Sequence, residues 1–296
     1  IRAVESLAAT SYANLEILVV DDGSSDGSGE QAARLSRQLP SVRALRHPGS
    51  QHRGVSASRN VGIAESHGEY VCFLDADDFV YPVRFIEPAD ILDGRPEVDA
   101  VYSRTSVIVE AGTGGRWWDD KGTFGFRVPP AEPELLRSLL SGQSWHTSGI
   151  LIRRRLIDRT GAFDPDLHIA EDCHLWFRMA ACGRIVADSF SSPVSAYVRH
   201  SANTYQPELA RKVDFLRAVV RARTWARSHA SGSIAVFRQE GARYLDSFLV
   251  QLFEQRRSDL VRALVLMLRR ERALTWLLRP RRLRLLIPLL TLCRER

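Results

Sequence analysis

Apolar runs and amphipathic segments alternate along the first hundred residues of the chain. Short apolar runs rich in β-branched residues predict strands at 15–20, 42–46 and 70–74. The intervening segments, at about 28–39 and 56–66, have the composition of helices. A strand, helix, strand, helix, strand order is typical of a parallel sheet with helices on both faces. The sequence therefore predicts an α/β domain.

The second half of the chain changes from strands to helices. β-Branched and apolar runs at 98–102, 107–109 and 150–152 predict further strands. From Glu208 onward apolar residues recur at helical spacing, until leucine and arginine dominate the last forty residues. We therefore predict that an α/β domain is followed by a helical extension over 206–296.

Composition excludes several classes of protein. The chain has 296 residues, 45% hydrophobic and 26% charged, which excludes disordered and collagen-like chains. Its four cysteines form no CxxC pair, so neither a zinc knuckle nor a disulfide framework is indicated. No run approaches the roughly 18–20 uncharged apolar residues of a membrane-spanning helix.

The net charge of +6 is unevenly distributed. Residues 1–200 carry −6 and residues 201–296 carry +12. Only Lys121 and Lys212 are lysines, so the basic residues are nearly all arginine. This bias indicates a GC-rich genome more than selection for anion binding. We expect no nucleic-acid partner. The basic helices either pack on the preceding domain, with their arginines snorkelling, or lie on an anionic membrane surface or on a partner.

Two acidic clusters follow two of the predicted strands. Asp21 and Asp22 come after the first, and Asp75, Asp77 and Asp78 come after the third. Ligands of open α/β sheets bind outside the carboxyl ends of the strands, where both clusters would lie. In an extended chain Asp75 and Asp77 would point to one side, where they could share a hard divalent cation and a diphosphate. Three adjacent carboxylates repel one another unless a cation lies among them, which argues against simple helix capping.

Three segments in order resemble the catalytic domain of family 2 glycosyltransferases, which are inverting enzymes with the GT-A fold. They read NLEILVVDDGSSDGS, GVSASRNVGIAESHGEYVCFLDADD and GAFDPDLHIAEDCHLWFRMAACG, and the resemblance spans roughly residues 1–205. It implies a GT-A type nucleotide-binding sandwich with a mostly parallel central sheet. It also implies a nucleotide-sugar donor, most commonly a UDP-sugar, a Mg²⁺ or Mn²⁺ ion, and transfer to a hydroxyl of a saccharide or lipid-linked acceptor.

The resemblance also implies roles for residues near the donor. Asp21 and Asp22 match the family's acidic pair, one of which holds the uracil or ribose. Asp75 and Asp77 match the DxD motif, with Asp77 as the direct metal ligand and Asp75 on the ribose or a metal-bound water. Arg59, which precedes Asn60 as in the family's Arg-Asn pair, would face the donor phosphates. The alternative for Arg59 is a surface or capping arginine.

Three further residues are implied on the acceptor and metal sides. Glu171 and Asp172 match the Glu-Asp pair that opens a helix in the family, with Asp172 as the catalytic base and Glu171 holding the acceptor or a loop. For both acids the alternative is a favourable charge at a helix N-terminus. His200 lies where many members have a histidine that approaches the metal, the alternative being a solvated loop histidine.

The start of the chain departs from the family pattern. Members begin with a strand of the type VSVIIPTYN, whereas this chain begins at Ile1, inside what resembles the following helix. We therefore expect an N-terminally truncated catalytic domain, with weakened donor binding.

Other functions fit the residues less well. A sugar-nucleotide pyrophosphorylase gives no account of the EDxxLW segment around Asp172. A phospho-acceptor receiver domain needs a lysine on a late strand, and Lys121 and Lys212 fall in a glycine-rich loop and a helix. A sugar-binding pseudoenzyme remains as an alternative. We expect a metal-dependent glycosyltransferase of glycan or cell-envelope polysaccharide synthesis. We expect it to be cytoplasmic, or to contact the inner face of the membrane peripherally.

Overall fold

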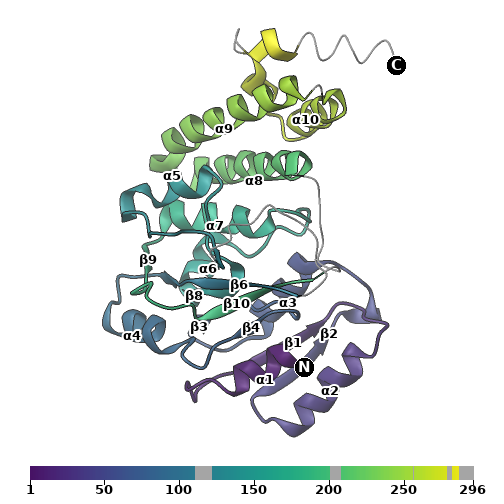
Figure 1. The fold of residues 1–296 in the computed structure, drawn as a ribbon, viewed down its shortest axis with the longest axis vertical. Coiled ribbons are helices and arrows are strands. Elements are labelled where there is room, and N and C mark those ends of the chain that lie inside the picture. The colour runs from purple at the N-terminus through teal and green to yellow at the C-terminus, as the bar shows by residue number, and fades with distance from the viewer. Residues whose placement is uncertain (111–121, 201–207, 256, 279–281, 287–296) are drawn as a thin grey trace. The chain divides into compact units, whose positions relative to one another are not determined.

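The structure, a computed structural model, describes residues 1–110, 122–200, 208–255, 257–278 and 282–286 (Figure 1). The chain divides into two compact units. The first comprises Ile1–Glu134, Gln143–His168 and Gly183–Asn203, and the second comprises Leu135–Gly142, Ile169–Cys182 and Thr204–Arg296. The predicted domain boundary at 205 stays a prediction. The compact units are divided differently, since two short segments before residue 205, Leu135–Gly142 and Ile169–Cys182, belong to the second unit. Residues 111–121, which include Trp117, Trp118 and Lys121, lie outside the described residues.

The first unit contains the strands. In chain order they are β1 (Ile17–Asp21), β2 (Val42–Arg46), β3 (Tyr70–Val71), β4 (Phe79–Val80), β5 (Ala100–Tyr102), β6 (Thr105–Val109), β7 (Thr123–Phe124), β8 (Ile150–Arg153), β9 (Ile185–Ala187) and β10 (Ser195–Arg199). Among the described residues they form three sheets, with the strand orders β1-β2, β4-β10-β6-β7 and β3-β8-β5-β9.

The α/β architecture is confirmed, and its strand directions are more mixed than expected. β1 and β2, β6 and β10, and β5 and β9 pair in parallel. The pairs β4-β10, β3-β8, β5-β8 and β6-β7 are antiparallel, so the ladders of the described residues are mixed rather than mostly parallel. An apolar run such as that of β8 predicts a buried strand but carries no information about its direction.

The helices of the first unit cover these strands. They are α1 (Arg2–Ala8), α2 (Ser28–Gln38), α3 (Val55–Glu65), α4 (Ile86–Gly94) and α6 (Arg154–Thr160). One core cluster joins α4 to β5, β8 and β9 through Leu92, Val101, Leu151 and Val186. A second joins α1 to β1 and β2. Burial of these apolar side chains positions the loops that follow the strands.

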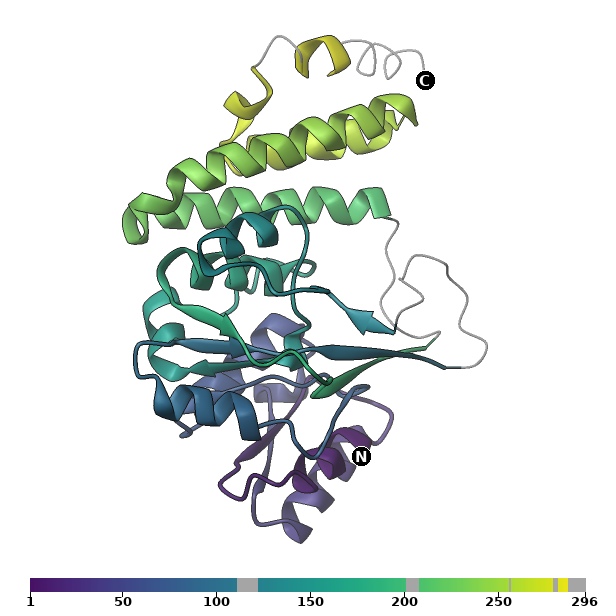
Figure 2. The ribbon, with the colours of Figure 1, turned by 60° about the vertical axis from the view of Figure 1, so that its left-hand side comes forward.

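The second unit is helical. It contains α5 (Leu135–Leu140), α7 (Glu171–Cys182), α8 (Glu208–His229), α9 (Ile234–Glu254) and α10 (Ser258–Arg270), followed by a short 3₁₀ helix at Leu274–Leu277. α8 and α9 run side by side in both views (Figure 1 and Figure 2). Phe215 of α8 packs against Phe177 of α7 and Tyr244 of α9. A helical C-terminal region is therefore confirmed. Within the described ranges, no helix is long and apolar enough to cross a membrane.

Candidate active site

The acidic loop, residues 75–78, connects β3 to β4. The amide of Asp78 donates to the carbonyl oxygen of Asp75 at 3.1 Å and closes a turn. The carboxylates of Asp75 and Asp77 therefore project from a turn, not from the extended strand expected from the apolar run. The expected strand at 70–74 is shorter in the structure, because the pairing of β3 with β8 ends at Val71.

Arg59, on α3, binds Asp75. Its Nη2 donates to Oδ1 of Asp75 at 2.7 Å, and its guanidinium lies 5.2 Å from the ring centroid of Phe163. Burial alone would raise the pKa of Asp75, but the charge and hydrogen bond of Arg59 hold this pKa below its ordinary value. The Arg59 side chain is only 11% exposed, so Arg59 is not a surface arginine. It is oriented into the acidic loop.

Asp77 and His200 meet although 123 positions separate them in the sequence. Nε2 of His200 lies 3.1 Å from Oδ2 of Asp77, and both side chains remain partly exposed. Arg2 of α1 also donates to the carbonyl oxygen of Asp77. The structure therefore brings together two of the three residues, Asp75, Asp77 and His200, for which the sequence predicts a place at the metal.

Asp78 is the buried member of the loop. Its Oδ1 accepts the N–H of Val198 of β10 at 2.9 Å, and its side chain is 0% exposed. Oδ2 has no hydrogen-bond partner among the described residues and lies 3.8 Å from Nδ1 of His146. Burial raises the pKa of Asp78 to about 7, and the charges of Asp75 and Asp77 add to this effect.

Two carboxylates of the loop and His146 together offer the donor set of a site for a divalent cation. Asp75, Asp78 and His146 each offer a ligand atom, and these atoms lie within 4.8 Å of one another. Carboxylate oxygens are the ligands that Mg²⁺ and Mn²⁺ prefer. A buried carboxylate oxygen without a partner is costly, and a nearby cation would offset that cost. The residues present therefore fit a divalent ion.

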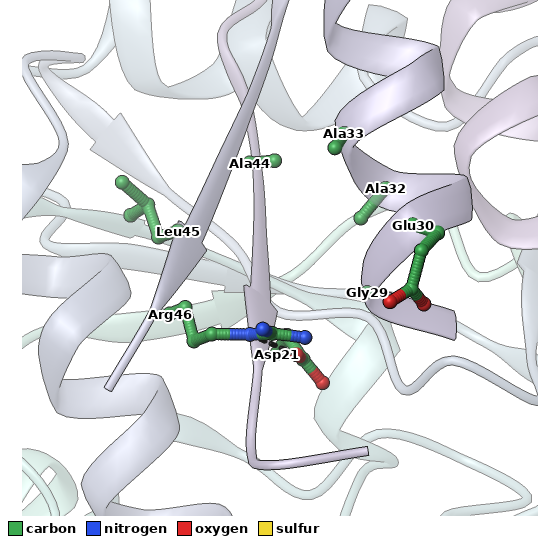
Figure 3. A pocket seen from close by; sticks show the side chains of 8 residues that line it. All are labelled: Asp21, Gly29, Glu30, Ala32, Ala33, Ala44, Leu45 and Arg46. Atoms are coloured by element: carbon green, nitrogen blue, oxygen red, sulfur yellow. Dashed lines mark hydrogen bonds and ion pairs between the residues drawn. The ribbon is translucent and has the colours of Figure 1, made fainter. Parts of the chain in front are cut away.

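Asp21 ends β1 and is held by neighbouring groups. It accepts the N–H of Ser24 at 3.0 Å and Nε of Arg46 at 2.7 Å. Although burial favours the neutral acid, these bonds lower the pKa of Asp21. Figure 3 shows the pair at one end of a cleft of about 300 Å³ along β2 and α2. A Cβ atom at Gly29 would lie 2.2 Å from Nη2 of Arg46, so the glycine leaves room for the ion pair against α2.

Asp22 faces the start of α3. Its two carboxylate oxygens accept the N–H groups of Arg53 at 2.7 Å and Gly54 at 2.9 Å, and Nδ1 of His52 lies 2.9 Å away. Asp22 therefore ties the end of β1 to the helix that carries Arg59. The predicted contact of Asp21 or Asp22 with uracil or ribose stays a prediction.

Glu171 and Asp172 are the first two residues of α7, in the second unit. Leu175, Trp176 and Met179 of this helix are 0% exposed and form its buried face. Ala170, directly before the helix, has a φ of 60°, in the left-handed region that residues with a Cβ rarely adopt. The assignment of Asp172 as the base stays a prediction.

Nothing in the sequence indicates that Asp78 and His146 would meet. Asp78 was visible as the third acid of the cluster, but its burial depends on β10, far along the chain. His146 precedes an apolar strand, and nothing in its local sequence indicates that its ring would lie beside Asp78.

Comparison with known proteins agrees with this geometry. The family model described as glycosyl transferase family 2 matches residues 1–158. The succinoglycan biosynthesis protein ExoO of Rhizobium meliloti is 29% identical over 277 residues, covering 89% of this chain and 76% of ExoO. An uncharacterized glycosyltransferase of Nostoc is 27% identical, covering 69% of this chain and 62% of that protein. The chain spans only 28% of a similar glycosyltransferase of Rickettsia conorii.

The fold has counterparts among solved structures. Residues 1–349 of S. aureus TarS, in complex with UDP-GlcNAc, superimpose with a TM-score of 0.69 at 17% identity, covering 99% of this chain and 87% of that one. The likeness in fold and the match of more than half of the chain to the family model lead to one conclusion: this chain belongs to glycosyl transferase family 2.

Proposed function

We propose that the protein transfers a sugar from a nucleotide-sugar donor to an acceptor hydroxyl with inversion at the anomeric carbon, in a reaction that requires a divalent ion. The observation that carries this proposal is the acidic loop, where Asp75 faces Arg59 and Asp77 faces His200. Carboxylates and cationic side chains in one place suit a donor diphosphate together with its counter-ion.

The residues of the loop have separate tasks in this proposal. Asp77 and His200 hold the ion, which would neutralise charge on the departing diphosphate. Asp75 contacts the donor ribose or a metal-bound water. Arg59 binds the phosphates, for which it has to turn part of its guanidinium from Asp75 to the donor. Asp21 or Asp22 holds the nucleoside.

Asp172 is the proposed base. As the acceptor oxygen attacks the anomeric carbon, the bond from that carbon to the diphosphate oxygen breaks, and the nucleoside diphosphate leaves with the bonding electrons. The hydroxyl proton passes to the Asp172 carboxylate. Glu171 holds the acceptor or a neighbouring loop.

We infer that the donor is a UDP-sugar and that the acceptor belongs to glycan or cell-envelope polysaccharide synthesis. S. aureus TarS, which has a similar fold, is in complex with UDP-GlcNAc, and ExoO is a succinoglycan biosynthesis protein. A lipid-linked acceptor would be reached from the cytoplasmic face of the inner membrane. Leu266, Leu274 and Leu278 are 63%, 41% and 66% exposed and lie beside exposed arginines, which favours peripheral contact with anionic lipid.

Donor binding with and without metal tests the proposal. The purified chain is titrated calorimetrically in Mn²⁺ and in EDTA with four donors: UDP-GlcNAc, UDP-glucose, GDP-mannose and dTDP-glucose. We expect the chain to bind donors of one nucleotide class, and to bind them in Mn²⁺ but not in EDTA. Asp77→Asn should abolish this binding and leave the circular dichroism spectrum unchanged.

Donor affinity that is equal in Mn²⁺ and EDTA would contradict metal dependence. Metal-dependent binding without donor hydrolysis or transfer to any acceptor would favour the pseudoenzyme. Release of pyrophosphate, rather than of a nucleoside diphosphate, would favour a pyrophosphorylase.

A further inference from the structure

A hydrogen bond between the Asp78 side chain and the backbone of β10 holds the acidic loop against this strand. The β4-β10 ladder pairs Val80 with Ser195 and Phe79 with Ala196, and extends no further. Beyond its end, the N–H of Val198 donates to Oδ1 of Asp78 at 2.9 Å. Asp78 therefore continues the contact between the two segments where their backbones no longer pair.

This hydrogen bond lies next to the proposed metal ligands. Asp78 directly follows Asp77, and Val198 precedes His200 by two positions. β10 is itself fixed by five consecutive residue pairs with β6, from Ser195–Thr105 to Arg199–Val109. The Asp78 carboxylate thus joins the loop that carries Asp77 to a rigid strand that leads into His200.

The second oxygen of Asp78 faces His146. Nδ1 of His146 lies 2.8 Å from Oγ of Ser148 and accepts the N–H of Ser148 at 3.3 Å. The imidazole stacks on Tyr197 with ring centroids 4.7 Å apart, so it too is packed against β10. Its Nδ1 lies 3.8 Å from Oδ2 of Asp78, which accepts no hydrogen bond in the part of the chain that the structure describes.

We propose that Asp78 and His146 are positioning residues for the divalent ion. Asp78 holds the acidic loop against β10 so that Asp77 and His200 converge, and its second oxygen adds negative charge beside the ion. His146, stacked on Tyr197 of β10, lies beside that oxygen and limits the space into which it can turn. Neither residue needs to touch the sugar. The inference rests on the proposed metal dependence and adds two residues to it.

Binding of Mn²⁺ alone, without donor, tests the proposal. Residues outside the ligand shell that orient metal ligands typically contribute about 10–100-fold to metal affinity. Asp78→Ala and His146→Ala should therefore each raise the Kd for Mn²⁺ at least about tenfold, measured by electron paramagnetic resonance of free Mn²⁺. Asp78→Asn keeps an acceptor for the Val198 N–H and loses the charge, so its effect should be smaller than that of Asp78→Ala.

Asp188 provides a matched control for a loss of stability. It is a buried acid that accepts one backbone N–H, that of Phe190 at 2.8 Å. Asp188→Ala should lower the thermal midpoint as Asp78→Ala does, with the Kd for Mn²⁺ unchanged. A purely structural role of Asp78 predicts the same result for both variants.

The outcomes separate this inference from the proposed function. If the native chain binds Mn²⁺ and Asp77→Asn abolishes binding, while folded Asp78→Ala and His146→Ala keep a Kd within twofold, only the positioning role is overturned. If Asp78→Ala does not fold, an unchanged Kd for Mn²⁺ in both His146→Ala and Asp78→Asn overturns the positioning role. Failure of the native chain to bind Mn²⁺ overturns both.

Discussion

The carboxyl group of Asp78 is buried, and burial changes its protonation. Its pKa in the folded chain, about 7, is well above the ordinary 3.8, so the folded state holds a proton that the unfolded state has released between these values. Stability from this residue is therefore present at low pH and lost as the pH rises through 7. Asp21 and Asp75, whose pKa values are lowered, act in the opposite sense, and only below about pH 4.

We expect the free energy of unfolding in EDTA to rise by about 2 kcal/mol between pH 7 and pH 5 because of Asp78. Urea denaturation at both pH values measures this change. In Asp78→Asn the rise should be smaller by that amount. Asp188 also has a raised pKa, so the comparison of the two proteins, not the native curve alone, isolates Asp78. Equal rises in both proteins would show that Asp78 is ionised throughout this range.

Asp172 and Glu171 can be told apart by turnover. Loss of a positioned base typically lowers the rate by about 10²–10⁴-fold. We expect this loss in kcat for Asp172→Asn, with the donor Kd unchanged, and a smaller loss with a raised acceptor KM for Glu171→Gln. Normal turnover in Asp172→Asn and loss in Glu171→Gln would move the base by one residue. Normal turnover in both would show that the base lies elsewhere.

The sequence anticipated contacts whose residues belong to recognisable motifs. Resemblance placed Asp75, Asp77 and His200 near one ion, and the structure brings Asp77 and His200 to 3.1 Å. It did not reveal Asp78 and His146, because their meeting depends on packing between segments distant in the sequence. Local spacing carries no signal of that packing.

At the level of elements, periodicity located strands and helices better than it oriented them. β2 has the predicted bounds of 42–46, and α2 and α3 each lie within one residue of theirs. The apolar runs of β3, β5 and β8 appeared equivalent in sequence, but β8 runs antiparallel to both of its neighbours. Strand direction is set by which faces pack in three dimensions, and a buried strand is apolar in either direction.

The start of α7 contains a strained position. A residue with a Cβ at the φ of Ala170 costs about 1 kcal/mol relative to glycine. Ala170→Gly should therefore raise the free energy of unfolding by up to about 1 kcal/mol. As a control, Ala33→Gly inside α2 should lower it by about 0.5–1 kcal/mol. Urea denaturation of both variants measures the two effects, and loss of stability in Ala170→Gly would show that the Cβ of Ala170 is needed for packing.

At the level of the whole molecule, charge and exposed leucine coincide in the second unit. Residues 201–296 carry +12, and Leu266, Leu274 and Leu278 are exposed beside Arg269, Arg270 and Arg272. We expect co-sedimentation with vesicles containing phosphatidylglycerol, weakened by high salt, and little with phosphatidylcholine alone. Changing the three leucines to serine should release the protein.

The control for this experiment is an exposed apolar residue of the first unit. Val128 is 78% exposed, and Val128→Ser should leave vesicle binding unchanged. Equal binding by the native chain and the triple serine variant would indicate that the arginines alone carry the interaction. Absence of binding to either vesicle would favour helices whose leucines and arginines serve packing within the chain.

The pairing of β4 with β10 also has a consequence for biosynthesis. The loop that follows β3 acquires its fixed form through a strand that is translated more than a hundred residues later. Long-range pairings of this kind form late, because a large loop must first be closed. A nascent chain therefore carries three neighbouring carboxylates in an open loop until Val198 and His200 have left the ribosome. The proposed catalytic centre therefore cannot form before about residue 200 has been translated.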